Sequence, residues 1–68
     1  MIKVGQIFRP NDSRRDNRRI RVDRTTKTKG VWYALVSARL VGQKAWKPAP
    51  AIRLDRLESR HYKLIRGA

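Results

Sequence analysis

Residues 19–41 read RIRVDRTTKTKGVWYALVSARLV, and they decide the fold that we expect. Ile20 and Val22 alternate with charged residues, which is the pattern of a strand with one buried face. The segment TTKTKG at 25–30 has the composition of a hairpin loop that ends in a glycine. The run from 31 to 41 is the longest apolar stretch of the chain, so we expect the longest strand there. Together these features predict a β-hairpin.

Alternation also predicts which side of the long strand faces the core. One side mixes apolar with polar residues: Val31, Tyr33, Leu35, Ser37 and Arg39. The other side is wholly apolar, and we expect it to lie in the core: Trp32, Ala34, Val36, Ala38 and Leu40.

The segment RRDNRR at 14–19 separates this hairpin from the N-terminal part of the chain. It has no apolar residue to bury, so we expect an exposed loop. A short helix is the alternative, because Ser13 and Asp16 have the spacing of a capping box. A helix without an apolar stripe is marginal in water, which favours the loop.

The remaining pattern predicts three further strands at 3–9, 51–57 and 61–65, and one tight helical turn at 55–59 that places Leu57 inward. The inward residues of the last two strands would be Ile52, Leu54, Tyr62 and Leu64. The segment GQKAWKPAP at 42–50 is predicted to be a loop, since two prolines disfavour a central strand. Five short strands without a long helix indicate an all-β fold, a small five-stranded antiparallel barrel that is strongly bent. We expect one domain over residues 1–68, with an exposed basic loop at 11–19 and a second loop at 42–50.

Composition narrows the cellular setting and the partner. The chain has no cysteine, which removes disulfides and thiolate metal sites and favours the reducing cytoplasm. The N-terminus MIKVGQIF lacks the long apolar segment of a signal peptide, and no apolar run is long enough to cross a membrane. Eighteen Lys and Arg against five Asp and Glu give a net charge of +13, far above the magnitude of about 2 to 8 that suits a small soluble domain. Such self-repulsion favours a polyanionic partner.

Several motifs resemble a family of small basic proteins encoded by actinobacteria and their bacteriophages. They cover about half of the positions, and IRLDRL followed by YKLI is the most specific pair: VGQ at 4–6, ND-x-RR at 11–15, RRIRV at 18–22, IRLDRL at 52–57 and YKLI at 62–65. The resemblance implies an SH3-like barrel and a bacteriophage or bacterial cytoplasmic setting, without an established activity. The 42–50 segment, with Trp46 and its two prolines, departs from the family pattern.

Catalysis is not expected, because an active site needs converging histidines, cysteines or acids. The chain has one histidine, His61, and each of its acids lies within two residues of an arginine. An acid in such a setting softens local repulsion. We therefore expect no enzymatic activity, no cofactor and no metal.

The first candidate binding residues are clustered arginines, which release counterions from a phosphate backbone. The alternative for such a charge run is a solvated face or loop. The cluster consists of Arg14, Arg15, Arg18, Arg19 and Arg21.

The second candidate is the indole of Trp46 between Lys44 and Lys47, which could stack on a base while the lysines hold phosphates. The alternative is that Trp46 folds back as a lid over one end of the barrel. A weaker third candidate is the outer face of the long strand, with Tyr33 and Arg39.

These observations predict a non-enzymatic module that binds DNA or RNA mainly through its backbone, with weak sequence selectivity. Twelve arginines against six lysines suit this role, because guanidinium groups bind phosphates bidentately. The rival hypothesis is a bacteriophage protein that binds an acidic host protein and modulates its activity. No membrane partner is expected, since no amphipathic helix appears.

Overall fold

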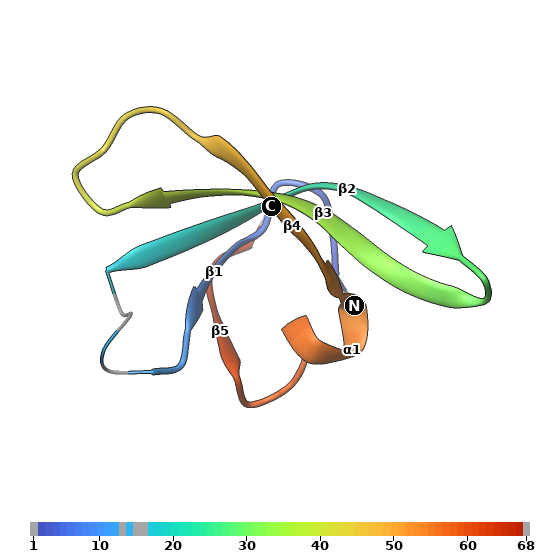
Figure 1. Ribbon diagram of the computed structural model, residues 1–68. Coiled ribbons are helices and arrows are strands. Elements are labelled where there is room, and N and C mark those ends of the chain that lie inside the picture. Colours follow the sequence, from blue (N-terminus) through green and yellow to red (C-terminus); the bar gives the residue numbers. More distant parts are fainter. Residues whose placement is uncertain (1, 13, 15–16, 68) are drawn as a thin grey trace.

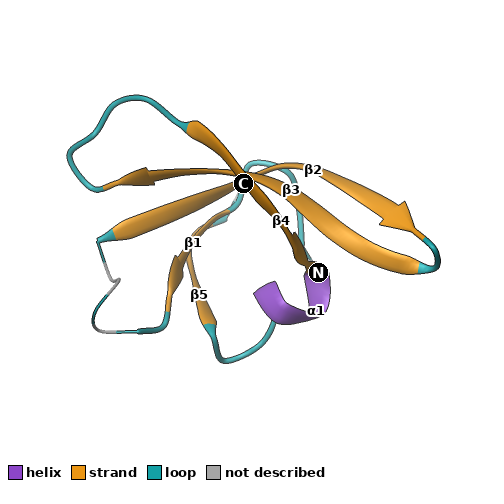
Figure 2. Cartoon of the chain, in the orientation of Figure 1, coloured by secondary structure: helices purple, strands orange, loops and turns teal. Residues whose placement is uncertain are grey.

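The computed structural model describes residues 2–12, 14 and 17–67 of the chain. These residues form five strands and one short helix, whose path is drawn in Figure 2. The elements are β1 (Ile7–Pro10), β2 (Arg18–Thr28), β3 (Val31–Leu40), β4 (Lys47–Arg53), α1 (Leu54–Leu57) and β5 (Tyr62–Arg66). The predicted all-β class, with five strands and a helical turn before the last one, is confirmed.

The strands form one antiparallel sheet in the order β4-β3-β2-β1-β5. The last strand therefore returns to pair with the first, and Figure 1 shows β1 and β5 lying below the long β2–β3 ribbon. Over the described residues no ladder joins β4 to β5, so these two strands are the edges of the sheet. The predicted SH3-like barrel is thus an open one, which hydrogen bonds do not close.

The β2–β3 hairpin is longer than predicted. Its strands pair as far as Thr28 opposite Val31, so the turn consists of Lys29 and Gly30 alone. Both turn residues have positive φ, 51° and 79°, as in the two-residue turns that match strand twist. The prediction of a loop over 25–30 was wrong, because its β-branched threonines favour extended backbone. The hairpin consequently extends beyond the rest of the sheet, at the right of Figure 1.

Two other predicted boundaries in the N-terminal part of the chain were wrong. The first strand begins at Ile7, after a turn in which Gly5 has a φ of 93°. The 11–19 segment is not a loop throughout, because β2 begins at Arg18 and pairs there with Leu40. The capping box predicted from 13 to 16 depends on residues outside the described ranges.

The predicted 42–50 loop also overlaps a strand, since β4 begins at Lys47 and includes both prolines of the segment. Pro48 lies opposite Ser37 in the ladder with β3. Proline is tolerated there because β4 is an edge strand, where a backbone nitrogen can face away from the neighbouring strand. The connecting segment between β3 and β4 is therefore 41–46.

The core is small and lies on the concave side of the sheet. Its buried residues are Phe8, Ile20, Val22, Ala34, Val36 and Leu57, with Ile2, Ala49, Ile52 and Tyr62 packed against them. The predicted inward face of β3 is confirmed at its centre, and Leu57 is inward as predicted, with 1% of its surface exposed.

The ends of that predicted inward face are not buried. Trp32 is 50% exposed and Leu40 is 43% exposed, because both ends of β3 extend past the core. Two inward predictions for the last strands also need correction. Leu54 is the first residue of α1 rather than part of a strand, and Leu64 on the edge strand β5 is 46% exposed.

Candidate nucleic-acid interface

The convex face of the sheet carries cations that lie directly opposite one another on neighbouring strands. Arg19 of β2 is paired with Arg39 of β3. Arg9 of β1 is paired with Lys63 of β5. Like charges placed directly opposite destabilise a sheet, so each pair costs stability in the free protein.

The pairing of β1 with β2 brings these two pairs into one line. The β1–β2 ladder ends with Phe8 opposite Ile20, and Arg9 and Arg19 are the next residues beyond that end, both on the outward side. We use the name cation row for these four residues on four strands: Lys63, Arg9, Arg19 and Arg39. Neighbouring strands of a paired sheet lie about 4.8 Å apart, so the row is at least about 14 Å long.

The indole of Trp46 lies against the same face. The guanidinium carbon of Arg21 is 4.7 Å from the ring centroid, and that of Arg39 is 4.5 Å from it. The described residues that pack against the core do not include Trp46, which is half-buried. Two cation–π contacts therefore hold the ring on the outer face, and they restrict the positions of both arginines.

Asp23 also restricts the position of Arg21. It lies where the register of β2 against β3 shifts, between Val22 and Arg24. Its carboxylate accepts a hydrogen bond of 2.8 Å from Nε of Arg21 and another from the hydroxyl of the buried Ser37. Burial raises the pKa of Asp23, but these two hydrogen bonds and the charge of Arg21 outweigh it and hold the pKa below its ordinary value. Arg21 is consequently held in an ion pair rather than left to move freely.

Arg19, Arg21, Arg39 and Trp46, all predicted from the sequence, thus share one face. Arg18 does not belong to it, because alternation places it on the side of Ile20. Arg18 and Lys47 line a shallow hollow beside Pro48, to which Arg39 also contributes.

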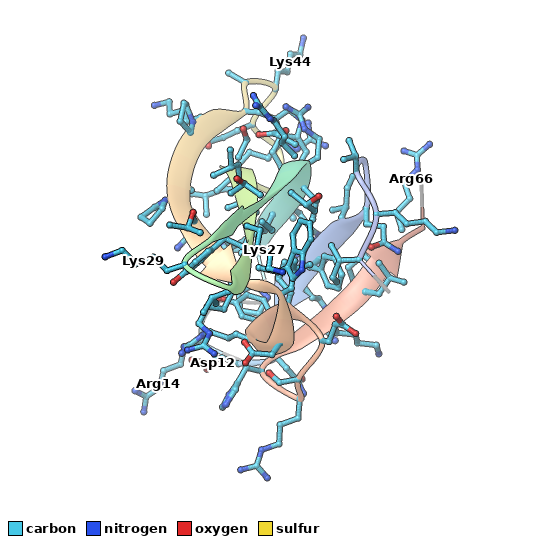
Figure 3. All side chains as sticks on the ribbon, turned by 90° about the vertical axis from the view of Figure 1, so that its right-hand side faces the viewer. Asp12, Arg14, Lys27, Lys29, Lys44 and Arg66 are labelled. Carbon is cyan, nitrogen blue, oxygen red and sulfur yellow. The ribbon has the colours of Figure 1, made fainter. Side chains whose placement is uncertain are left out.

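Two other predicted residues are remote from this face, and one cannot be placed. Figure 3 shows Arg14 and Lys44 at widely separated positions, each pointing away from the body of the protein. The backbone N–H of Arg14 donates a 3.0 Å hydrogen bond to the side chain of Asp12, which makes a local turn. Arg15 lies outside the described residues.

Sequence reasoning missed Arg9 and Lys63. The available signal was alternation, since Arg9 follows the buried Phe8 and Lys63 lies between two residues predicted to face inward. Neither residue belongs to a charge run, so each became significant only through the pairing of β1 with β5.

Two ion pairs join acidic and basic side chains among the described residues. Within the described ranges the ion pairs are Arg21–Asp23 and Arg53–Asp55, the latter at 3.2 Å and well exposed. The same part of the chain contains no cluster of three or more metal-ligating side chains. It also has no helix of the length and apolar character that would cross a membrane. Positive charge is therefore the dominant chemical property of this surface.

Comparison with protein-family models, with curated proteins and with solved structures finds no significant match for the chain. The resemblance to small actinobacterial and bacteriophage proteins therefore depends on the quoted motifs alone.

Proposed function

We propose that the protein is a non-enzymatic nucleic-acid-binding module that holds a phosphate backbone along the cation row. The observation that carries this proposal is the direct pairing of Arg9 with Lys63 and of Arg19 with Arg39. Cations placed opposite one another concentrate positive charge on one face, and a polyanion laid across them is attracted to it. On the resemblance of its motifs, we assign it to bacteriophage or actinobacterial accessory proteins.

The number of cations in the row supports a backbone ligand. Each of the four cations can neutralise one phosphate, so the row can make up to about four phosphate contacts. Contacts to phosphates fix position and carry no sequence information, which accounts for weak sequence selectivity in DNA or RNA binding.

Trp46 and Asp23 order the side chains of Arg21 and Arg39 before phosphates bind. Arg21 and Arg39 both lie against the indole, and Arg21 is also bound to Asp23. A side chain that is already ordered loses less conformational entropy when it binds. The ring therefore contributes by positioning two guanidinium groups beside the row.

The test is binding of labelled duplex and single-stranded octamers to the protein across a salt series. Four phosphate contacts predict a slope of log affinity against log salt of about −3.6 for duplex DNA and about −2.8 for a single strand. The variant Arg9→Ala/Arg39→Ala/Lys63→Ala should reduce the slope to about −1. The matched control removes three exposed cations elsewhere, Arg14, Lys44 and Arg60.

The two variants have the same net charge, so they separate a defined site from diffuse attraction. If both lose affinity equally, the row is not the site. If the wild type binds no oligonucleotide at low salt, the proposed function is wrong. In that case, retention of an acidic protein from nuclease-treated lysate by the wild type, and not by the row variant, would favour the rival hypothesis of a protein partner.

A further inference from the structure

Trp32 is an exposed indole near the tip of the β2–β3 hairpin, far along the ribbon from Trp46. Half of its surface is open to solvent, and it lies opposite Lys27, whose Nζ is 5.9 Å from the ring centroid. By alternation it faces the same side as the buried Ala34. The ring therefore stands beyond the core on the concave side of the sheet, without other side chains to cover it fully.

A hollow of about 370 Å³ adjoins this ring. It lies between the hairpin and α1, and its lining residues are Ile2, Thr25, Trp32, Leu54 and Glu58. Two of them are aliphatic, one is a flat aromatic ring, one has a hydroxyl and one has a carboxylate. Recognition of an extruded base uses this combination: stacking between apolar surfaces, with a few polar groups that bind its edge.

Glu58 is the unusual member of this set. The chain has a net charge of +13, yet the ion pairs of the described residues do not include Glu58. Its carboxylate can only accept hydrogen bonds, because an ionised carboxylate has no donor. A ligand in the hollow that presents an N–H or O–H group can therefore donate to it.

We propose that this hollow binds one unpaired base that carries an exocyclic amino group, such as cytosine, of a nucleic acid whose backbone lies on the cation row. The base would stack on Trp32 and donate its amino hydrogens to Glu58, the pairing by which acids select cytosine. This inference rests on the proposed function and specifies its ligand, since a base in a duplex cannot enter the hollow.

The hairpin supplies phosphate contacts for the same strand. Lys27 lies beside the ring, and Lys29 at the turn extends into open space, as Figure 3 shows. Arg21 and Lys27 are six residues apart on β2, about 20 Å along the ribbon. Small nucleic-acid-binding barrels hold about 4–16 nucleotides. Because the cation row lies on the convex face and the hollow on the concave side, one strand contacts both by passing round the edge of the hairpin.

A protein side chain fits this hollow less well than a base. An apolar side chain would remove water from Glu58 without offering it a hydrogen-bond donor, which is costly. A lysine or arginine of a partner would offer donors but would approach a protein of net charge +13. A neutral flat ring with an amino group meets both requirements.

The experiment compares single-stranded octamers of deoxycytidine and deoxyuridine, whose bases differ at the amino group. The wild type should bind the cytosine octamer more tightly. Glu58→Gln should abolish that preference, because its amide can donate to the O4 of uracil. The variant also removes a negative charge and strengthens binding to both octamers, so the ratio of the two affinities is the readout.

Trp32→Ala tests the stacking contact. It should weaken binding of the cytosine octamer by about 5- to 100-fold, the range for loss of one stacked base, and leave the salt slope unchanged. Trp32→Phe should retain part of the affinity, and the circular dichroism spectrum of each variant reports whether it folds. Unchanged affinity in a folded Trp32→Ala variant, or an unchanged cytosine preference in Glu58→Gln, would overturn the proposal. Either result would leave the row variant and its control as a separate test of the proposed function.

Discussion

Removal of one charge from the cation row should raise the free energy of unfolding and should also lower the affinity for nucleic acid. Arg9 and Lys63 lie directly opposite each other on β1 and β5. Two unit charges about 5 Å apart repel by about 0.8 kcal/mol in water, within the range of about 0.2–1 kcal/mol for cross-strand pairs. Lys63→Gln removes this repulsion, and Lys63→Glu replaces it with an attraction of similar size.

The expected gain in the free energy of unfolding is therefore about 0.8 kcal/mol for Lys63→Gln and about twice that for Lys63→Glu. In a domain of this size 1 kcal/mol corresponds to about 4–8 °C in Tm, so thermal unfolding followed by circular dichroism resolves both changes. At 1 M salt the Debye length falls to about 3 Å, and the two variants should then approach the wild type.

Two controls separate repulsion from other effects of the substitution. Lys29→Gln and Lys29→Glu make the same charge changes at the exposed hairpin turn, away from the row, and they should change Tm less. A difference in strand propensity between Lys and Gln would persist at high salt, whereas repulsion would not. If Lys63→Glu lowers Tm at low salt, or if its effect does not depend on salt, the cation row is not a site of mutual repulsion.

Three further predictions concern Asp23, Trp46 and Leu57. The pKa of Asp23 lies below its ordinary value of 3.8, so its stabilising contribution is complete above that pH and is lost as pH falls through the lower pKa. Urea unfolding between pH 2 and pH 6 should show this loss in the wild type and a smaller loss in Asp23→Asn, and a loss in Asp23→Asn as large as the wild type's would contradict the prediction. Trp46→Ala removes two cation–π contacts of about 0.5–1 kcal/mol each and should weaken oligonucleotide binding while the protein stays folded; a variant that unfolds would place the ring in the core instead. Leu57→Ala should cost about 2–5 kcal/mol, measured by the same urea unfolding, and a loss below 1 kcal/mol would show that α1 contributes little to the core.

The inner faces of the strands could be predicted because a strand with one buried face has apolar residues at every second position. Ala34 and Val36 are buried as that period required, and Leu57 is buried after the predicted helical turn. The boundaries could not be predicted in the same way. Whether Pro48 can occupy a strand depends on that strand being an edge, and this is a property of the whole sheet.

The residues of the candidate site also fall into two groups, those that the local sequence reveals and those that only the strand pairing reveals. Arg19 and Arg21 could be found from local charge, and Arg39 from its outward position on the long strand. Arg9 and Lys63 could not, because they are separated by more than fifty residues and meet only through the pairing of the first and last strands. The position of Trp46 against two arginines depends on the course of the 41–46 segment, which has no periodic pattern to reveal it.

The two prolines of β4 have a consequence for self-association. Proline in a sheet is confined to positions where its nitrogen faces away from the neighbouring strand, so Pro48 and Pro50 leave the free edge of β4 with carbonyl groups but without their N–H partners. The other free edge, β5, has no proline and carries the exposed Leu64 and Ile65. Of these two edges β5 is thus the one open to backbone pairing with a second copy, and an assembly built on that single edge ends at a two-fold pair instead of growing into a fibre.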